Sequence, residues 1–318
     1  MKAVALRVAQ WVITPLAAVL APLFALVART GFGVGICRRL GFHPVRLHYY
    51  QPIPRYEELP AAAFDERQAF PGFRIDVDKV RGILRGLARF GGEANWTRDP
   101  APPGTYSAAN DNFGFSSAAL LHAFIRAHGT RKVVEIGGGY SSLVTLGALE
   151  RNHPSGAFRL VCVEPHPAPW LREAIRARGE SATLVERPVE RLDPGELAGL
   201  EPNDILFIDS SHCVRLASDV NFLYLQVLPR LKPGVLVHIH DIYIPYEYPR
   251  IHFFGRNKMF WNEQYLLQAL LSENRRFEIL VPGYFVQRDL AQEFAQAFPA
   301  YDPARDRRTS SFWLGRVA

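Results

Sequence analysis

Residues 131–145 read Arg-Lys-Val-Val-Glu-Ile-Gly-Gly-Gly-Tyr-Ser-Ser-Leu-Val-Thr. Val133 and Val134 are β-branched, which suits a strand buried in a parallel sheet. The glycines at 137–139 let the chain turn sharply and let a ligand approach the backbone closely. Ser141 or Ser142 can then cap a helix. A strand, a glycine turn and a helix in this order predict the nucleotide-binding start of a doubly wound α/β sheet.

Glu135 indicates which nucleotide would bind, because it stands at the end of the strand, directly before the glycines. A carboxylate there is unfavourable beside the pyrophosphate of NAD, but it suits a cofactor that ends in a cationic amino acid. Glu135-x-Gly137-x-Gly139 resembles the first motif of the class I S-adenosylmethionine-dependent methyltransferases. The resemblance implies that S-adenosyl-L-methionine binds here, with the cofactor-binding residues Glu135, Gly137, Gly138, Gly139, Tyr140 and Ser141.

Glu164 is the second acid of the predicted cofactor site. It follows a predicted strand at 158–163, near the point where such folds place an acid on the ribose hydroxyls. One carboxylate and two hydroxyls match as hydrogen-bond acceptors and donors. We therefore predict that Glu164 binds the cofactor, and a surface glutamate at a strand end is the alternative.

Strand and helix patterns alternate along the rest of the chain. The further predicted strands lie at 182–185, 204–208, 235–237, 277–281 and 311–317. The predicted helices lie at 76–90, 116–128 (capped by Ser116 or Ser117), 167–178, 216–231 (with Leu216, Val220, Leu223, Val227 and Leu231 on one side) and 262–271. With the resemblance, these patterns predict a doubly wound, seven-stranded, mostly parallel Rossmann-like sheet with an antiparallel final strand.

Two polar motifs, Asp209-Ser-Ser-His212 and His238-Ile-His240-Asp241, each close a predicted strand. In an open parallel sheet, ligands bind outside the carboxyl ends of the strands. We therefore expect Asp209, His212, His240 and Asp241 to converge beside the cofactor.

The order of these motifs resembles the small-molecule O-methyltransferases of class I, over residues 106–318. In their metal-dependent branch, residues after the fourth and fifth strands hold magnesium. Asp209 and Asp241 fall on two of these positions, and His240 falls on the third, where the family usually has an acid. Histidine is a softer ligand than Mg²⁺ prefers, so Mg²⁺, Mn²⁺, Zn²⁺ or no metal stays open.

The resemblance also implies the catalytic residues. His212 falls where catechol-type enzymes carry their catalytic base, and an imidazole can accept a hydroxyl proton at neutral pH. Asp209 and Asp241 would orient the acceptor, and Asp209 also counts among the cofactor-binding residues. The alternatives are that Asp209 only caps the next helix and that His212 only lines the pocket.

Two further features carry open interpretations. His238 lies deeper than His240 on its strand, which favours a hydrogen-bonded core histidine over a ligand. Residues 243–261 are rich in aromatic side chains and contain Pro245 and Pro249. This loop is either a lid over the acceptor or a segment packed on the N-terminal extension.

Composition limits the partners. The net charge of +6 comes from scattered residues, and no Lys/Arg run with interleaved aromatic residues occurs, so nucleic acid is disfavoured. The three cysteines, Cys37, Cys162 and Cys213, form no Cys-x-x-Cys pair and no disulfide framework. Such a set is typical of a reducing compartment, and we predict a cytoplasmic enzyme.

Residues 8–28 are apolar apart from Gln10 and Thr14, and they are enough to cross a bilayer as a helix. A buried helix and a secretory signal are the alternatives, and Pro15 and Pro22 oppose a simple straight helix. More arginines follow the segment than precede it, which would place the following domain at the cytoplasmic face of the membrane. The predicted domains are an apolar segment at 1–35, an extension at 36–105 and the methyltransferase domain at 106–318.

The sequence thus predicts an S-adenosylmethionine-dependent methyltransferase that acts on a hydroxyl of a small-molecule, glycan or lipid-linked acceptor. One alternative is an NAD-linked Rossmann oxidoreductase, because Gly137-x-Gly139-x-x-Ser142 is an imperfect dinucleotide motif. Another is a membrane-associated nucleotide-binding protein without catalysis. The sequence does not fix the acceptor or the oligomeric state.

Overall fold

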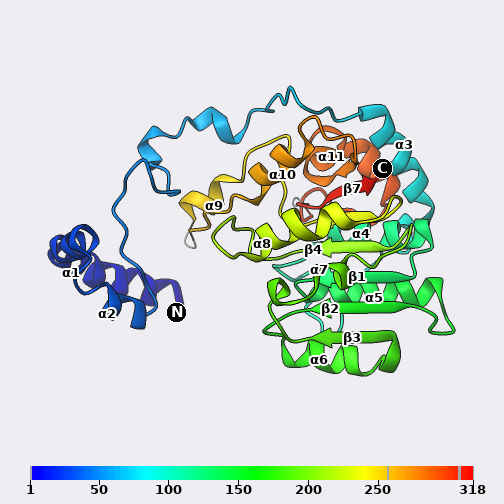
Figure 1. Cartoon of the computed structure of the whole chain (residues 1–318), viewed down its shortest axis with the longest axis horizontal. Coiled ribbons are helices and arrows are strands. Elements are labelled where there is room, and N and C mark those ends of the chain that lie inside the picture. Colours follow the sequence, from blue (N-terminus) through cyan, green and yellow to red (C-terminus); the bar gives the residue numbers. More distant parts are fainter. Residues whose placement is uncertain (1, 256–257, 307–308, 318) are drawn as a thin grey trace. The chain divides into compact units, whose positions relative to one another are not determined.

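The structure is a computed structural model that describes residues 2–255, 258–306 and 309–317 (Figure 1). Contacts divide the chain into two compact units, Met1–Ala61 and Ala62–Ala318. The predicted boundaries after residues 35 and 105 differ from this division by contacts and stay predictions. Each unit is described by itself below.

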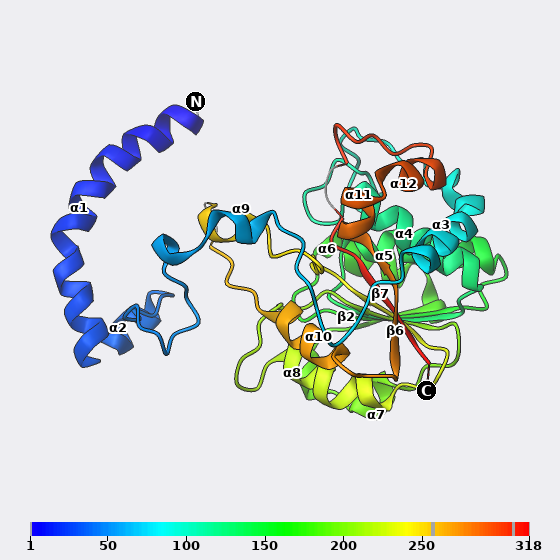
Figure 2. The same cartoon turned by 90° about the horizontal axis from the view of Figure 1, so that it is seen from above.

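The first unit is dominated by α1, which spans Lys2–Thr30 and is followed by α2 at Val34–Arg39 and a short 3₁₀ turn at Tyr56–Glu58. Pro15 and Pro22 lie inside α1 without interrupting it, and Figure 2 shows the helix as bowed. Gln10–Thr30 has a mean hydropathy of 2.2 in its most apolar window, and none of that window is buried. By length and composition this helix could cross a membrane.

The second unit is built on a seven-stranded sheet in the order β3-β2-β1-β4-β5-β7-β6. All its neighbouring strands run parallel except β7, which is antiparallel to both β5 and β6. The strands span Lys132–Ile136 (β1), Arg159–Val163 (β2), Ala182–Val185 (β3), Ile205–Ile208 (β4), Leu236–Ile239 (β5), Phe277–Pro282 (β6) and Phe312–Arg316 (β7). This arrangement confirms the predicted fold class.

Helices cover both faces of the sheet, and each face has its own hydrophobic core. Figure 2 shows α3, α4, α5, α11 and α12 on one face and α7, α8 and α10 on the other. The helices span Val77–Gly91 (α3), Phe115–His128 (α4), Tyr140–Asn152 (α5), Pro169–Arg176 (α6), Pro194–Leu197 (α7), Asp219–Phe222 (α8), Arg250–Phe254 (α9), Glu263–Leu271 (α10), Gly283–Asp289 (α11) and Ala291–Ala297 (α12). Short 3₁₀ turns lie at Ala61–Phe64, Gly179–Ser181 and Val189–Arg191.

Two local predictions were wrong. The helix at 115–128 has Gly114 as its N-cap, and the hydroxyl of Ser116 instead donates to the carbonyl of Asp306. The predicted helix at 216–231 begins later than expected, because α8 starts only after its cap Ser218. The helical backbone then continues as a π-helical turn at Leu223–Val227 and a 3₁₀ turn at Leu228–Arg230. Leu216 is therefore outside the helix and 97% exposed.

Candidate active site

In the glycine turn after β1, neighbouring atoms leave no room for a side chain at Gly137 and Gly138, but they leave room for one at Gly139. A Cβ at Gly137, whose φ is +85°, would lie 1.8 Å from the carbonyl oxygen of Asp209, and one at Gly138 would lie 2.2 Å from Sγ of Cys162. A Cβ at Gly139 would meet no atom within 4 Å. The turn therefore needs small residues where it packs against β2 and β4, and it leaves backbone accessible at Gly139.

Glu135 is fully buried in β1 between Cys162 of β2 and Phe207 of β4. Neither carboxylate oxygen has a hydrogen-bond partner among the described residues. Burial raises the pKa of this carboxyl to about 8, and the nearby hydroxyls of Ser141 and Ser142 offset this only in part. A buried carboxyl without a partner fits a site for the ammonium group of an amino-acid cofactor.

Glu164 follows β2 at the same edge of the sheet, and one of its oxygens accepts a hydrogen bond from the backbone N–H of His166 at 2.7 Å. Tyr140 begins α5 and its ring lies 5.2 Å from that of Trp170. Ser141 and Ser142 follow, but the N-cap of this helix is Gly139, so the prediction of a serine cap was wrong. The Ser142 hydroxyl, at the third helical position, accepts from the N–H of Gly139 at 3.1 Å. These positions are compatible with the predicted cofactor site, and their roles stay predictions.

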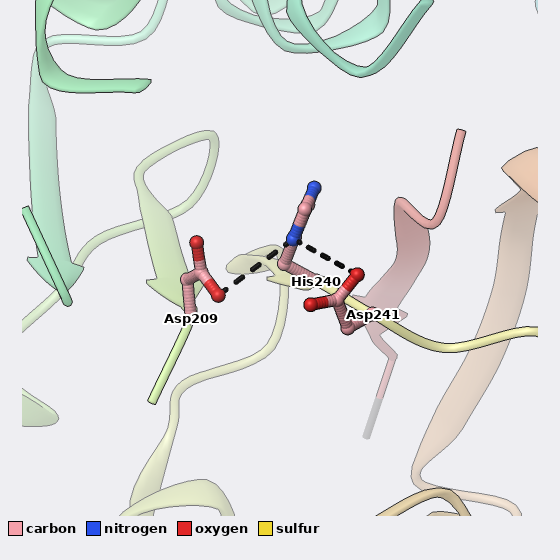
Figure 3. Close-up of side chains that lie close together, drawn as sticks. All are labelled: Asp209, His240 and Asp241. Atoms are coloured by element: carbon pink, nitrogen blue, oxygen red, sulfur yellow. Dashed lines mark ion pairs between the residues drawn. The ribbon is translucent and has the colours of Figure 1, made fainter. Parts of the chain in front are cut away.

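Asp209, His240 and Asp241 converge at the carboxyl ends of β4 and β5 (Figure 3). Nδ1 of His240 lies 3.6 Å from Oδ1 of Asp209 and 3.5 Å from Oδ1 of Asp241. His212 joins them, because its Nε2 lies 3.3 Å from Oδ1 of Asp209 and 3.5 Å from Oδ2 of Asp241. The four side chains that the sequence predicts to converge therefore lie together.

Burial and the pairing of opposite charges shift the pKa values of this cluster in opposite directions. Burial alone would raise the pKa of both aspartates, but His240 lowers the pKa of Asp241 to about 2 and, with His212, also lowers that of Asp209. Burial would lower the pKa of His240, but Asp241 and Asp209 raise it to about 10. The carboxylates and imidazoles thus stabilise one another in their charged forms.

Glu263, which the sequence analysis missed, is the closest partner of His212. It is the first residue of α10 and fully buried, and its Oε2 lies 2.8 Å from Nδ1 of His212. Burial would lower the pKa of His212, but the hydrogen bonds to Asp209 and Glu263 raise it well above its usual value. This environment stabilises an imidazolium, which is the form that a general base acquires when it takes a proton.

The backbone holds the cluster in an unusual conformation. His212 has φ +57° and Asp241 has φ +56°, in the left-handed region that non-glycine residues rarely adopt. The N–H groups of Asn262 and Glu263 both donate to the carbonyl of His212, at 3.0 and 3.2 Å. The N–H of Ile242 donates to the carbonyl of Ser310 at 3.0 Å. Such strain is typical of functional sites, where the surrounding contacts maintain it.

Two alternatives from the sequence are now decided. His238 is fully buried, its Nε2 lies 2.8 Å from Oγ of Ser311, and its ring stacks on Phe207, so it is the predicted core histidine. Asp209 does not cap the following helix, because Ser218 does.

The aromatic loop at 243–261 contacts both the cluster and the segment before α3. The ring of Trp261 lies 4.4 Å from that of His212, and the hydroxyl of Tyr243 donates to Asp241 at 3.4 Å. The middle of the loop packs on the segment before α3, where Phe64 lies 5.8 Å from Phe253. Its ends therefore border the cluster, whereas its action as a lid stays a prediction.

Comparison with known families agrees with this geometry. Residues 134–242 match the family model described as a methyltransferase domain. This part of the chain is a methyltransferase domain. It contains β1 to β5 together with Glu135, the glycine turn, Glu164 and the cluster at 209–241. The sequence analysis predicted a methyltransferase from the same residues, with S-adenosylmethionine as its cofactor.

Individual relatives of the methyltransferase domain are distant. An uncharacterized protein from Archaeoglobus fulgidus is 28% identical over 171 residues, which cover 50% of this chain and 74% of that protein. The S-adenosylhomocysteine-bound methyltransferase PaMTH1 from Podospora anserina is 14% identical with a TM-score of 0.39, covering 77% of this chain and 98% of that chain. CalS11, a TDP-rhamnose 3′-O-methyltransferase of calicheamicin biosynthesis, is 13% identical with a TM-score of 0.39, covering 77% and 96%.

Proposed function

We propose that this methyltransferase transfers a methyl group to a hydroxyl of a small-molecule, glycan or lipid-linked acceptor, with His212 as the general base. The observation that carries the proposal is the hydrogen bond of 2.8 Å between His212 and Glu263. If Glu263 accepts the proton of Nδ1, then Nε2 is the nitrogen that takes the hydroxyl proton when His212 is in its neutral form. Nε2 is also the nitrogen that faces Asp209 and Asp241, at the carboxyl edge of the sheet.

The cofactor fits the residues at the end of β1. Its sulfonium supplies an activated methyl group for direct displacement. Glu135 would pair with the ammonium group, Glu164 would accept from the ribose hydroxyls, and the backbone at Gly139 would be approached closely. In this proposal the protein contributes binding, orientation of the acceptor and removal of the hydroxyl proton by His212.

Asp209, His240 and Asp241 form the candidate site for a divalent cation. Their ligand atoms all lie within 4.8 Å of one another. A cation there would orient the acceptor hydroxyl and stabilise its alkoxide form. Without a cation, the two aspartates would orient the acceptor through hydrogen bonds.

Calorimetry and a labelled-cofactor assay test the proposed function together. We expect S-adenosylhomocysteine to bind and NAD to give little heat. Methyl transfer from labelled S-adenosylmethionine to a panel of hydroxyl-bearing metabolites, glycans and polyprenyl-linked sugars should then reveal the acceptor. Tight binding of NAD without S-adenosylhomocysteine would establish the oxidoreductase alternative, and cofactor binding without transfer to any acceptor would favour the non-catalytic one.

We expect Glu164→Ala to weaken S-adenosylhomocysteine binding by about 1–3 kcal/mol, the cost of leaving buried hydrogen-bonding groups without a partner. Calorimetry measures this directly. Glu180→Ala is a matched control, since Glu180 is exposed on the turn before β3. Equal affinities of both variants and the original chain would remove Glu164 from the cofactor site.

We also propose that the first unit associates with a membrane through residues 8–28, with the methyltransferase domain at the cytoplasmic face. The exposed apolar side chains of α1, among them Trp11, Val19 and Leu26, support this proposal. Arg29, Arg38, Arg39 and Arg46 follow the apolar segment at 8–28, as the positive-inside rule requires for a cytoplasmic domain.

Removal of residues 1–28 should move the protein from the membrane fraction to the soluble fraction and leave its S-adenosylhomocysteine affinity unchanged. Fractionation by ultracentrifugation, with and without detergent, measures the first effect. If the full chain stays in the soluble fraction without detergent, the membrane proposal is wrong.

A further inference from the structure

We infer that the cluster of Asp209, His240 and Asp241 selects a transition-metal ion such as Mn²⁺ or Zn²⁺ over Mg²⁺, with Nδ1 of His240 as a ligand and Ser310 as the residue that orients it. The inference rests on the cation site of the proposed function and names the ion that this site takes. It does not depend on the acceptor or on the role of His212.

Nδ1 of His240 is a buried nitrogen without a hydrogen-bond partner among the described residues. The side chain is 5% exposed, and Figure 3 shows this nitrogen between the two carboxylates. Its distances of 3.5 and 3.6 Å to their oxygens are too long for charge-assisted hydrogen bonds, which are about 2.7–2.9 Å. Donors that each lie about 2.1 Å from one tetrahedral ion are themselves about 3.4 Å apart, so the spacing suits a shared ion.

Ser310 determines which nitrogen of His240 is free. Its hydroxyl donates to Oδ1 of Asp241 at 2.7 Å and also lies 3.3 Å from Nε2 of His240. A serine hydroxyl has a single proton, so toward His240 it can only accept. Nε2 therefore carries a proton, and a cation that displaces the proton of Nδ1 would meet the lone pair of this nitrogen between the carboxylates. This arrangement matches metal sites in which an outer residue fixes the tautomer of a histidine ligand.

The donor set then determines the ion. Mg²⁺ prefers oxygen ligands in an octahedral arrangement, whereas imidazole suits Zn²⁺ and other transition metals. Two carboxylates and one imidazole therefore favour the transition metals. A third carboxylate in place of His240 would shift the preference toward Mg²⁺.

Titration of the metal-stripped full chain with MnCl₂, ZnCl₂ and MgCl₂ tests the inference by calorimetry, and Mn²⁺ electron paramagnetic resonance counts the bound ions. We expect Mn²⁺ and Zn²⁺ to bind at least about 10²-fold more tightly than Mg²⁺. His240→Asp should reduce this ratio at least about 10-fold. Ser310→Ala should weaken Mn²⁺ binding by about 10–100-fold, the usual loss for an outer-shell partner, and Ser310→Thr should restore it because it keeps the hydroxyl.

Two results would overturn the inference. One is Mg²⁺ binding as tightly as Mn²⁺, and the other is an unchanged Mn²⁺ affinity in both His240→Asp and Ser310→Ala. S-adenosylhomocysteine binding reports whether each variant is folded. If His240→Asp fails to fold, the Mn²⁺ affinities of Ser310→Ala and Ser310→Thr still test the inference. Ser272→Ala, on an exposed residue, is the control. The metal titration does not depend on methyl transfer. Failure of the proposed function would instead appear as absent cofactor binding or absent turnover, so the two failures can be told apart.

Discussion

Replacement of His212 by alanine is expected to lower the rate of methyl transfer by about 10²–10⁴-fold, the range for loss of a general base. The hydroxyl proton would then meet only the carboxylates of Asp209 and Asp241, which are weaker bases than an imidazole. Single-turnover transfer from labelled S-adenosylmethionine measures the rate, and calorimetry should show that cofactor affinity survives. His43→Ala, on an exposed histidine of the first unit, is the control.

A change at Glu263 should lower the rate of methyl transfer less than the loss of His212 does. Glu263→Gln removes the charge that stabilises the imidazolium but keeps a similar shape, so we expect a loss of about 10–10²-fold, equivalent to 1.5–3 kcal/mol for a hydrogen bond to a charged group. The exposed Glu190→Gln is its control. If His212→Ala turns over at a near-normal rate, His212 is not the base, and His240 becomes the next residue to test.

Glu135→Gln is expected to stabilise the cofactor-free protein, and more so at pH 8 than at pH 5. The pKa of Glu135 is raised from 4.5 to about 8 by burial. Between these values the folded chain keeps a proton that the unfolded chain has lost, so stability falls as pH rises, by up to about 1.4 kcal/mol per pH unit. Glutamine removes this contribution. Urea unfolding at both pH values measures it, and an equal shift at pH 5 and pH 8 would contradict the expectation.

The same variant should lose affinity for the amino-acid end of the cofactor. We expect S-adenosylhomocysteine to bind at least about 10-fold more weakly, because a charge-assisted pair has been lost. Methylthioadenosine, which lacks the amino-acid group, should bind the variant and the original chain equally. Weakening of both ligands by the same factor would mean that Glu135 shapes the turn and does not contact the ammonium group.

The sequence predicted those parts of the site whose residues follow strands directly. Glu135, Glu164, Asp209 and Asp241 each lie at or just after the end of a parallel strand, and this position alone places them at one edge of the sheet. The strands themselves were visible as short runs of β-branched and aliphatic residues. The predicted fold followed from these runs and from the resemblance.

The missed residues contact the site across long sequence separations. Glu263 lies 51 residues beyond His212, and Ser310 lies 69 residues beyond Asp241. Each belongs to an element that packs beside the cluster only in the folded chain, and neither stands in a motif. The wrong helix cap has the same cause, because Ser116 donates to Asp306, 190 residues further along. A capping preference is local, and a distant carbonyl can override it.

The position of β7 has a consequence for how the enzyme is made on the ribosome. β7 is synthesised after every other strand of the sheet, yet it inserts between β5 and β6. Until then the edge of β5 is unpaired, and Ser310, two residues before β7, is not yet held beside His240. A nascent chain stalled before this point would carry both aspartates and both histidines but would lack the oriented Nδ1. In the proposed cation site, Nδ1 of His240 therefore acquires its orientation only when β7 closes the sheet.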